Sequence, residues 1–498
     1  MKTRHASRRV RGTALRRSLP RCLQCAPLRV ENAALREKNE RLLKENERLL
    51  RENEAHQQEI AQLRESLSQA QRAAKRQAAP FSKGAPKADP KRRGRKPGRD
   101  YGLRAHRRPP QHIDEIIDVP RPDRCECGGE VDGNEVVAQY QTEIPVKPVH
   151  RRFDVHFGQC TNCGRRVQGR HPLQTSDAVG AAAAQLGPQA QAMVATLKDE
   201  VGVSYGDIEK IFLRGWGISL TRGGAAQIVL RVGRRLDAPY RGILVVVRRS
   251  RLVYPDETGW KVAALLWWMW VFVTRTATAF VIRHSRGHDV PEEILGRYWS
   301  GTMVHDGWMP YDFFEHALHQ QCLGHIQRRC KVLLETASRG AVRYPRAVLL
   351  LTKDAFALRD RRDAGLISPH GLSVARGRLE SRMDRVLQWR LTHPANRRLA
   401  KHLAAHRDEL LVFLKRRGIE ATSWPADQAI RGPVANRKVF GGNRDPAGAR
   451  ALERIGSVVA TAVKRRINVV EYVVRVLCAA PDLRARLACH LLGVPLPP

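Results

Sequence analysis

Two acidic residues that each follow a β-like run constrain this sequence more than any other feature. Within residues 252–325, Asp256 comes just after a short β-like run, two further β-like runs follow, and Asp306 comes just after residues 302–304. Acids at the ends of two strands can converge on one divalent cation, and hard oxygen ligands suit Mg²⁺ or Mn²⁺. Phosphodiester chemistry is the leading function of such an arrangement.

An apolar run follows the first acid. Residues 262–273 form a dense apolar segment that includes Trp267, Trp268 and Trp270, which we interpret as a buried strand of a mixed sheet. The alternative is an aromatic platform for bases, but Trp267 and Trp268 are adjacent and would point to opposite faces. The run is shorter than the roughly 20 residues that span a bilayer as a helix. We therefore expect no transmembrane segment.

The charge of the chain points to a polyanionic partner. The net charge is +39 over 498 residues, and basic side chains that displace counterions provide most of the sequence-independent affinity for DNA. DNA is therefore the expected partner; the alternative is a generally basic proteome. The ten cysteines, several in close pairs, suit metal ligands in a reducing cytoplasm. No apolar segment of a secretory signal follows the first 27 residues, so we expect a cytoplasmic, nucleoid-associated protein.

A heptad pattern follows the basic tail. Leucine recurs at one core position and asparagine at the other, in a segment rich in Glu, Lys and Arg. Asparagine at a core position costs stability but fixes register and favours two strands, so we expect a parallel homodimeric coiled coil; the alternative is a lone charged helix. The core positions are Leu35, Leu42, Leu49 and Leu63, and Asn32, Asn39, Asn46 and Asn53.

The next segment is rich in Lys, Arg, Gly and Pro and cannot bury a core, so we expect a disordered basic linker. Its cations could enter a narrow A·T-rich minor groove or simply neutralise phosphates. The DNA-contacting candidates are Arg93, Arg95, Lys96 and Arg99.

Two close cysteine pairs follow the linker. Cys125 and Cys127 are separated by β-like sequence from Cys160 and Cys163. This pattern predicts a zinc ribbon, in which four thiolates complete a closed structural Zn²⁺ site. The first pair is one residue shorter than the usual spacing, and the alternative is four unmetallated thiols.

Helical periodicity then predicts a helix-turn-helix-like region. Residues 202–212 suit the first helix, residues 217–221 suit the turn and the second N-cap, and Arg222 falls early in the candidate recognition helix. A helical hairpin without groove contacts is the alternative.

The ordered motifs resemble those of the insertion sequence 66 family of bacterial transposases, of the TnpC type. The resemblance covers nearly everything after the basic tail, and it implies an RNase H-like core in which three acids bind two metal ions. It also implies a helical insertion between the second and third acids, and small accessory proteins of the same element. The matching motifs are the zipper, the Gly-Arg-Lys-Pro-Gly linker, the paired cysteines, residues 256–260, 306–308, 311–312 and 322–325, and residues 426–431, 436–438 and 441–442.

The resemblance locates the third acid at Asp427, where the family has glutamate. If the site is active, Asp256 and Asp306 hold one cation and share a second with Asp427. Aspartate keeps the charge but is one methylene shorter, which moves a metal ligand. The implied phosphate contacts after it are Arg431, Arg437 and Lys438.

We therefore expect a multidomain α/β protein with an RNase H-like mixed-sheet core that performs metal-dependent strand cleavage and transfer. The alternatives are an inactive, transposase-derived DNA-binding protein and another RNase H-like nuclease. The expected segments are a basic tail (1–27), coiled coil (28–76), basic linker (77–115), zinc ribbon (116–172), helix-turn-helix-like region (185–240), first part of the core (250–330), helical insertion (331–420), and end of the core with C-terminal helices (421–492).

Overall fold

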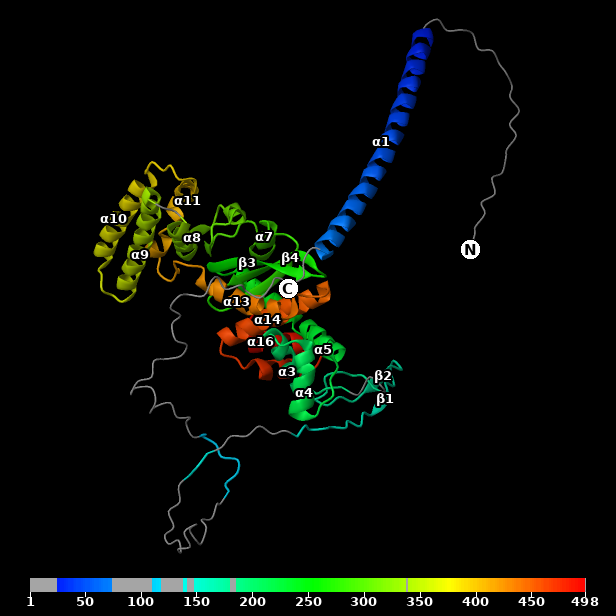
Figure 1. Ribbon diagram of the computed structural model, residues 1–498. Coiled ribbons are helices and arrows are strands. Elements are labelled where there is room, and N and C mark those ends of the chain that lie inside the picture. Colours follow the sequence, from blue (N-terminus) through cyan, green and yellow to red (C-terminus); the bar gives the residue numbers. More distant parts are fainter. Residues whose placement is uncertain are drawn as a thin grey trace, which may run out of the picture. The chain divides into compact units, whose positions relative to one another are not determined.

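The computed structural model describes residues 25–73, 110–117, 138–140, 147–179, 185–336 and 339–497. The chain divides into two compact units, Met1–Lys75 and Arg76–Pro498. The first contains one long helix, and the second is built around a five-stranded sheet covered by helices (Figure 1).

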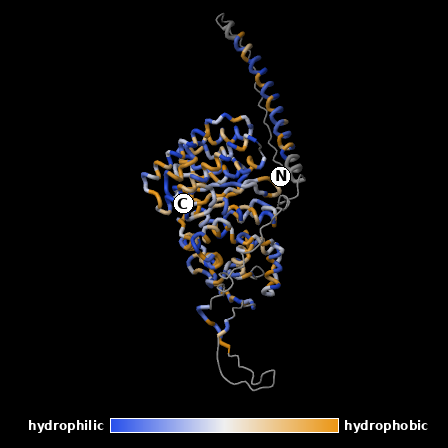
Figure 2. The backbone as a smooth tube through the Cα atoms, turned by 60° about the vertical axis from the view of Figure 1, so that its left-hand side comes forward, coloured by the Kyte–Doolittle hydropathy of each residue, from blue (hydrophilic) through white to orange (hydrophobic). Residues whose placement is uncertain are grey.

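Helix α1 (Cys25–Ala73) forms the described part of the first unit. Its residues are mostly hydrophilic, with hydrophobic residues at intervals (Figure 2), and ion pairs such as Arg41 with Glu37 at 2.5 Å link successive turns. The leucines of the heptad are exposed, Leu42 by 54% and Leu49 by 48%. A single copy of this helix therefore leaves its apolar positions in water.

The sheet has strand order β5-β4-β3-β6-β7. Strands β3, β4 and β5 pair antiparallel, whereas β6 and β7 run parallel to β3. The apolar run that we interpreted as one strand spans a hairpin, because Ala263 and Ala264 have positive φ angles of 50° and 67° and turn the chain from β3 into β4. The strands are β3 (Leu252–Val262), β4 (Leu265–Val273), β5 (Thr278–Arg283), β6 (Thr302–His305) and β7 (Leu318–Gln321).

The described part of the second unit also contains a two-stranded hairpin of β1 (Phe157–Gln159) and β2 (Arg166–Gln168), fourteen α-helices and three short 3₁₀ helices. The α-helices are α3 (Pro188–Asp199), α4 (Tyr205–Trp216), α5 (Arg222–Arg235), α6 (Asp237–Arg248), α7 (Asp289–Leu295), α8 (Leu323–Thr336), α9 (Arg343–Asp363), α10 (Pro369–Leu387), α11 (Pro394–Ala405), α12 (Val412–Lys415), α13 (Trp424–Phe440), α14 (Pro446–Lys464), α15 (Val469–Cys478) and α16 (Arg484–Leu492). The 3₁₀ helices are η2 (Met309–Phe313), η3 (Arg339–Val342) and η4 (Arg407–Glu409).

Helix α14 covers the edge of the sheet at β5. Three polar side chains spaced four residues apart on α14 accept hydrogen bonds from three N–H groups spaced two residues apart on β5. Four helical residues and two strand residues both advance the chain by about 6 Å, so the two rows match, and the edge is closed to further strand pairing. The pairs are Thr461 with Thr278 at 3.1 Å, Ser457 with Phe280 at 2.8 Å, and Glu453 with Ile282 at 2.5 Å.

Helices α3 to α6 pack with α14, α15 and α16 on one face of the sheet. Ser204 is the N-cap of α4, and its Oγ accepts a hydrogen bond from the N–H of Asp207 at 3.1 Å. Gly217 ends α4 with φ at 66°, and Thr221 caps α5. The turn and the second N-cap lie where the sequence predicts them. Residues 202–204, which we expected in the first helix, instead precede it, because Ser204 is its N-cap.

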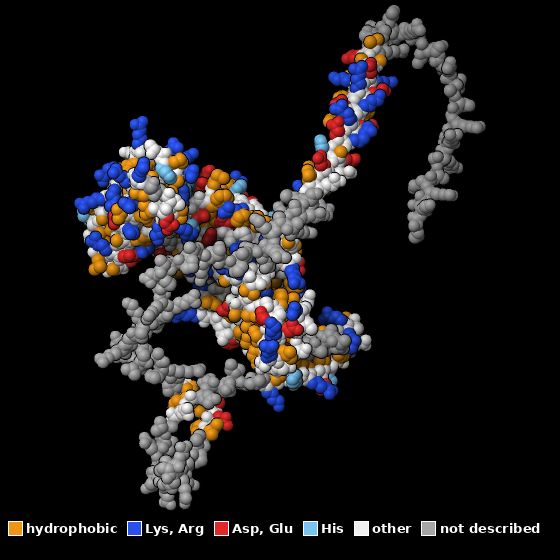
Figure 3. Space-filling model, in the orientation of Figure 1, with side chains coloured by type: hydrophobic (Ala, Val, Ile, Leu, Met, Phe, Trp, Pro, Cys, Tyr) orange, Lys and Arg blue, Asp and Glu red, His pale blue; other side chains and the backbone are white. Residues whose placement is uncertain are grey.

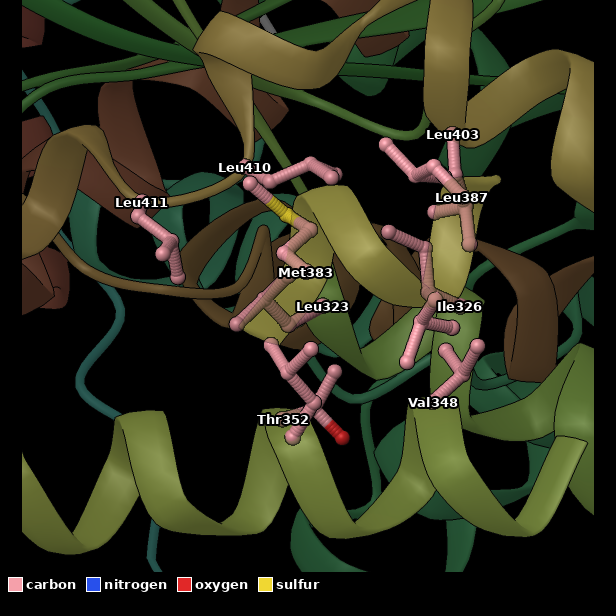
Figure 4. Close-up of a pocket in the computed structure, with 11 residues that line it drawn as sticks. Leu323, Ile326, Val348, Thr352, Met383, Leu387, Leu403, Leu410 and Leu411 are labelled. Atoms are coloured by element: carbon pink, nitrogen blue, oxygen red, sulfur yellow. The ribbon is translucent and has the colours of Figure 1, made fainter. Parts of the chain in front are cut away.

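The helical insertion, α8 to α12, packs its own hydrophobic core against the other face of the sheet. Between α8, α9, α10 and α11 lies a gap of about 20 Å³ lined by aliphatic side chains, Met383 and Thr352 (Figure 4). The hydroxyl of Thr352 donates to the carbonyl of Leu349 at 2.9 Å. The gap is therefore a packing space rather than a place for polar chemistry.

Candidate active site

The register of the sheet places the first two acids at the same level. Strand β3 runs parallel to β6, and Val253 lies opposite Met303. Asp256 follows Val253 by three residues and Asp306 follows Met303 by three residues. Because neighbouring parallel strands lie about 4.8 Å apart and advance together, the two carboxylates come from adjacent positions of the sheet.

Burial and neighbouring negative charges disfavour the ionised form of Asp256. Burial, followed by the negative charges of Glu257 and Asp306, raises the pKa of Asp256 to about 7. Burial and the charge of Asp306 also raise the pKa of Glu257. Oxygen ligands with unneutralised negative charge fit a hard divalent cation, so Asp256 and Asp306 suit the expected Mg²⁺ or Mn²⁺.

A clamp made of Glu257, Arg286, Trp308 and Tyr311 holds the two acid-bearing segments together. Arg286 donates to Glu257 Oε1 from Nη2 at 2.8 Å and from Nε at 3.1 Å, and Tyr311 donates to Glu257 Oε2 at 2.9 Å. The guanidinium lies 3.9 Å from the ring centroid of Trp308, whose backbone N–H donates to Asp306 at 2.9 Å. The clamp thus connects β3 to the turn that carries Asp306.

Sequence reasoning missed Glu257 as part of the site. Adjacent residues of a strand point to opposite faces, so an acid directly after Asp256 places a second carboxylate on the other face of the sheet. Only 2% of the Glu257 side chain is exposed. A buried acid of that kind needs a cationic partner.

The Cys322 and His325 pair also adjoins the acids. The N–H of Ser423 donates to Cys322 Sγ at 3.2 Å, and hydrogen bonding with Cys322 raises the pKa of His325, to which Asp306 adds. Burial raises the pKa of Cys322, but hydrogen bonds from His325 and Ser423 outweigh burial and leave this pKa lowered. These residues are therefore a polar wall of the site.

The third expected acid pairs with a cation of its own helix. Asp427 lies in the first turn of α13, and its carboxylate pairs with Arg431 at 3.1 Å. The start of this helix is tied to the site through Ser423, but among the described residues no three His, Cys, Asp or Glu side chains form a group that could hold a metal ion.

The segment after Asp427 anchors α13 to β3. Arg437 donates to the carbonyl of Gly259 and lies 3.4 Å from Thr258 Oγ1, so its guanidinium is engaged within the fold. Asn443 accepts from the indole N–H of Trp260 at 2.7 Å. Arg437 and Asn443 therefore hold the end of α13 and the segment after it against β3, a role that sequence reasoning did not assign.

A glycine makes the approach of this segment possible. Gly442 has φ at 114°, and a Cβ there would collide with the carbonyl oxygen of Lys261. Lys438 is exposed on the same helix.

The remaining expected contacts divide between described and undescribed residues. Arg222 is exposed at the first position of α5 and pairs with Glu209 at 3.0 Å. Those outside the described residues are Arg93, Arg95, Lys96, Arg99, Cys125 and Cys127.

The second cysteine pair lies on a hairpin of β1 (Phe157–Gln159) and β2 (Arg166–Gln168). Gly164 has φ at 69° and donates to the carbonyl of Cys160 at 2.9 Å. Hydrogen bonds with Cys163 and with the backbone of Asn162 lower the pKa of Cys160, which suits a thiolate ligand. This turn fits one half of a structural zinc site.

The comparison with protein families matches residues 183–451 to "Transposase IS66 family". The match covers more than half of the 498 residues and includes α3 to α6, the whole sheet, the insertion and α13. None of the curated proteins compared matches the chain, and none of its described helices is long and apolar enough to cross a membrane. The mixed five-stranded sheet is consistent with a DDE transposase core, and we conclude that this chain belongs to the IS66 family of transposases.

Proposed function

We propose that this protein cleaves and joins DNA strands at the ends of an insertion element, in a reaction that depends on Mg²⁺ or Mn²⁺. The observation that carries the proposal is the half-buried pair of Asp256, on β3, and Asp306, directly after the parallel strand β6, inside the segment matched to the transposase family. A bound divalent cation would supply Lewis-acid activation of water or a 3′-hydroxyl and stabilise the leaving oxygen.

The residues of the chain have separate tasks in this proposal. Asp256 and Asp306 would hold the cation, while Arg286 binds Glu257 and stacks on Trp308, which keeps the turn of Asp306 in place. Asp427 completes the acid set only after its carboxylate leaves Arg431, so DNA or metal binding must compete with an ion pair of 3.1 Å. Because Arg431 is exposed, that pair costs at most about 1 kcal/mol to break.

The proposed phosphate contacts of α13 are its exposed cations Arg431 and Lys438, and the proposed contact of α5 is Arg222. The basic linker with Arg93, Arg95, Lys96 and Arg99 would add sequence-independent affinity. We further propose a structural Zn²⁺ held by Cys125, Cys127, Cys160 and Cys163, and a dimer formed through the exposed leucines of α1.

The test is a cleavage and strand-transfer assay on a plasmid that carries this coding sequence with its native flanking DNA. The wild type should give nicked and joined products with Mg²⁺ or Mn²⁺ and none with a chelator. Asp256→Asn and Asp306→Asn should each abolish them. Equal product yield from Asp306→Asn would refute the proposal.

A second candidate is a DNA-binding protein that no longer cleaves. The ion pair of Asp427 with Arg431 and the shorter side chain at this position favour it. Asp427→Glu distinguishes the two, because a strand-transfer rate that rises at least 10-fold in Asp427→Glu identifies a weakened enzyme. Binding without cleavage in both the wild type and Asp427→Glu identifies the non-catalytic protein.

A further inference from the structure

Helix α11 is the part of the helical insertion that contacts the turn carrying Asp306. A Cβ on Gly307 would lie 2.6 Å from Cε1 of His402, so the imidazole of His402 lies directly against the residue after Asp306. Burial, followed by the positive charge of Arg329, lowers the pKa of His402 to about 4. This helix therefore adjoins the acid site through an uncharged ring.

The outer surface of the same helix is cationic. Arg397, Arg398 and Lys401 are exposed, whereas Leu399 and Leu403 face the core of the insertion. Arg397 and Lys401 are four residues apart and form one row, about 6 Å long. Arg398 lies four residues before His402, on the same side of the helix and one turn away from the acid site.

These three cations have no acidic partner among the described residues, whereas nearby Arg407 binds Asp384 at 2.8 Å. The insertion as a whole is strongly basic, with 20 Lys and Arg against 9 Asp and Glu in residues 331–420. Figure 3 shows Lys and Arg side chains gathered over this lobe. Closely spaced cations without acidic partners suit successive phosphates of a nucleic-acid backbone.

We propose that Arg397, Arg398 and Lys401 form a phosphate-binding track that guides the DNA backbone into the acid site. This inference rests on the proposed function for the identity of the substrate. It assigns to the insertion the role of a DNA-holding arm, with His402 as the contact between the track and the turn of Asp306.

The test compares two triple variants of the full chain, each losing three positive charges. In the track variant Arg397, Arg398 and Lys401 are changed to Gln. In the control variant Lys353, Arg361 and Arg417, which are exposed cations of the insertion away from α11, are changed to Gln. Circular dichroism and thermal melting verify that both variants fold.

The readout is the dependence of affinity for a fluorescent duplex on salt concentration, measured by anisotropy without divalent metal. Each lost phosphate contact reduces the slope of log K against log salt by about 0.9, so the track variant should lose about two to three units and the control less than one. Equal slopes for the two variants overturn the inference.

Cleavage activity separates this inference from the proposed function. If the track variant has the lower slope but the wild type does not cleave DNA, the result supports the track and refutes the catalytic proposal. If the wild type cleaves DNA but the slope of the track variant is unchanged, the result refutes the track and leaves the catalytic proposal standing.

Discussion

Replacing Asp256 by asparagine should stabilise the metal-free protein at high pH. The carboxylate is buried beside two other acids, and its pKa is raised from an ordinary 3.8 to about 7. The folded state therefore binds this proton more tightly than the unfolded state does. The stability that protonated Asp256 contributes is fully present below about pH 4 and is lost as pH rises toward 7.

The magnitude follows from the shift. About three pKa units correspond to roughly 4 kcal/mol at pH 8, and this penalty disappears when the group cannot ionise. Asparagine retains the acceptor for the N–H of Glu257, which donates to Asp256 at 2.9 Å. Stabilisation by loss of a functional acid is the usual trade between stability and activity.

The assay is urea unfolding followed by tryptophan fluorescence, with a chelator present, at pH 5 and pH 8. The free energy of unfolding of Asp256→Asn should exceed that of the wild type by about 4 kcal/mol at pH 8 and by much less at pH 5. The control Asp482→Asn removes an exposed acid and should change neither value by more than about 0.5 kcal/mol. A difference for Asp256→Asn that is the same at both pH values, or a loss of stability at pH 8, would refute the reasoning.

Three further changes test other parts of the account. Ser457→Ala should lower the free energy of unfolding by about 1–3 kcal/mol in thermal melting, because it leaves the buried N–H of Phe280 without an acceptor; an unchanged melting temperature would contradict the edge-covering role of α14. Arg286→Lys should slow strand cleavage roughly 10- to 100-fold while the fold is retained in circular dichroism, because an ammonium cannot make the two-donor contact with Glu257; a rate within twofold of the wild type would count against the clamp. Gly442→Ala should cost about 1–3 kcal/mol in urea unfolding, and an unaltered midpoint would show that the segment can shift away from β3.

The sequence indicates local structure well where one residue type decides it. Gly217 and Thr221 indicate the turn and the second N-cap, and the structure has the C-cap of α4 at Gly217 and the N-cap of α5 at Thr221. Asp306 directly follows β6, as the apolar β-like run before it indicates. Asp256, expected just after a strand, instead lies inside β3, because the pairing of β3 with β4 continues to Val262.

The rest depends on contacts between distant segments. The pairing of Glu453, Ser457 and Thr461 with β5 joins residues more than 170 positions apart, and no local pattern reveals which edge a helix will cover. The contact of Arg437 with the carbonyl of Gly259 is an example of the same limit, because it joins residues 178 positions apart.

The most direct test of the central claim is Mn²⁺ binding to the purified protein by isothermal titration calorimetry at pH 8. The account predicts a binding site that is retained in Asp482→Asn and lost in both Asp256→Asn and Asp306→Asn. Undiminished Mn²⁺ affinity in Asp256→Asn and Asp306→Asn would contradict it.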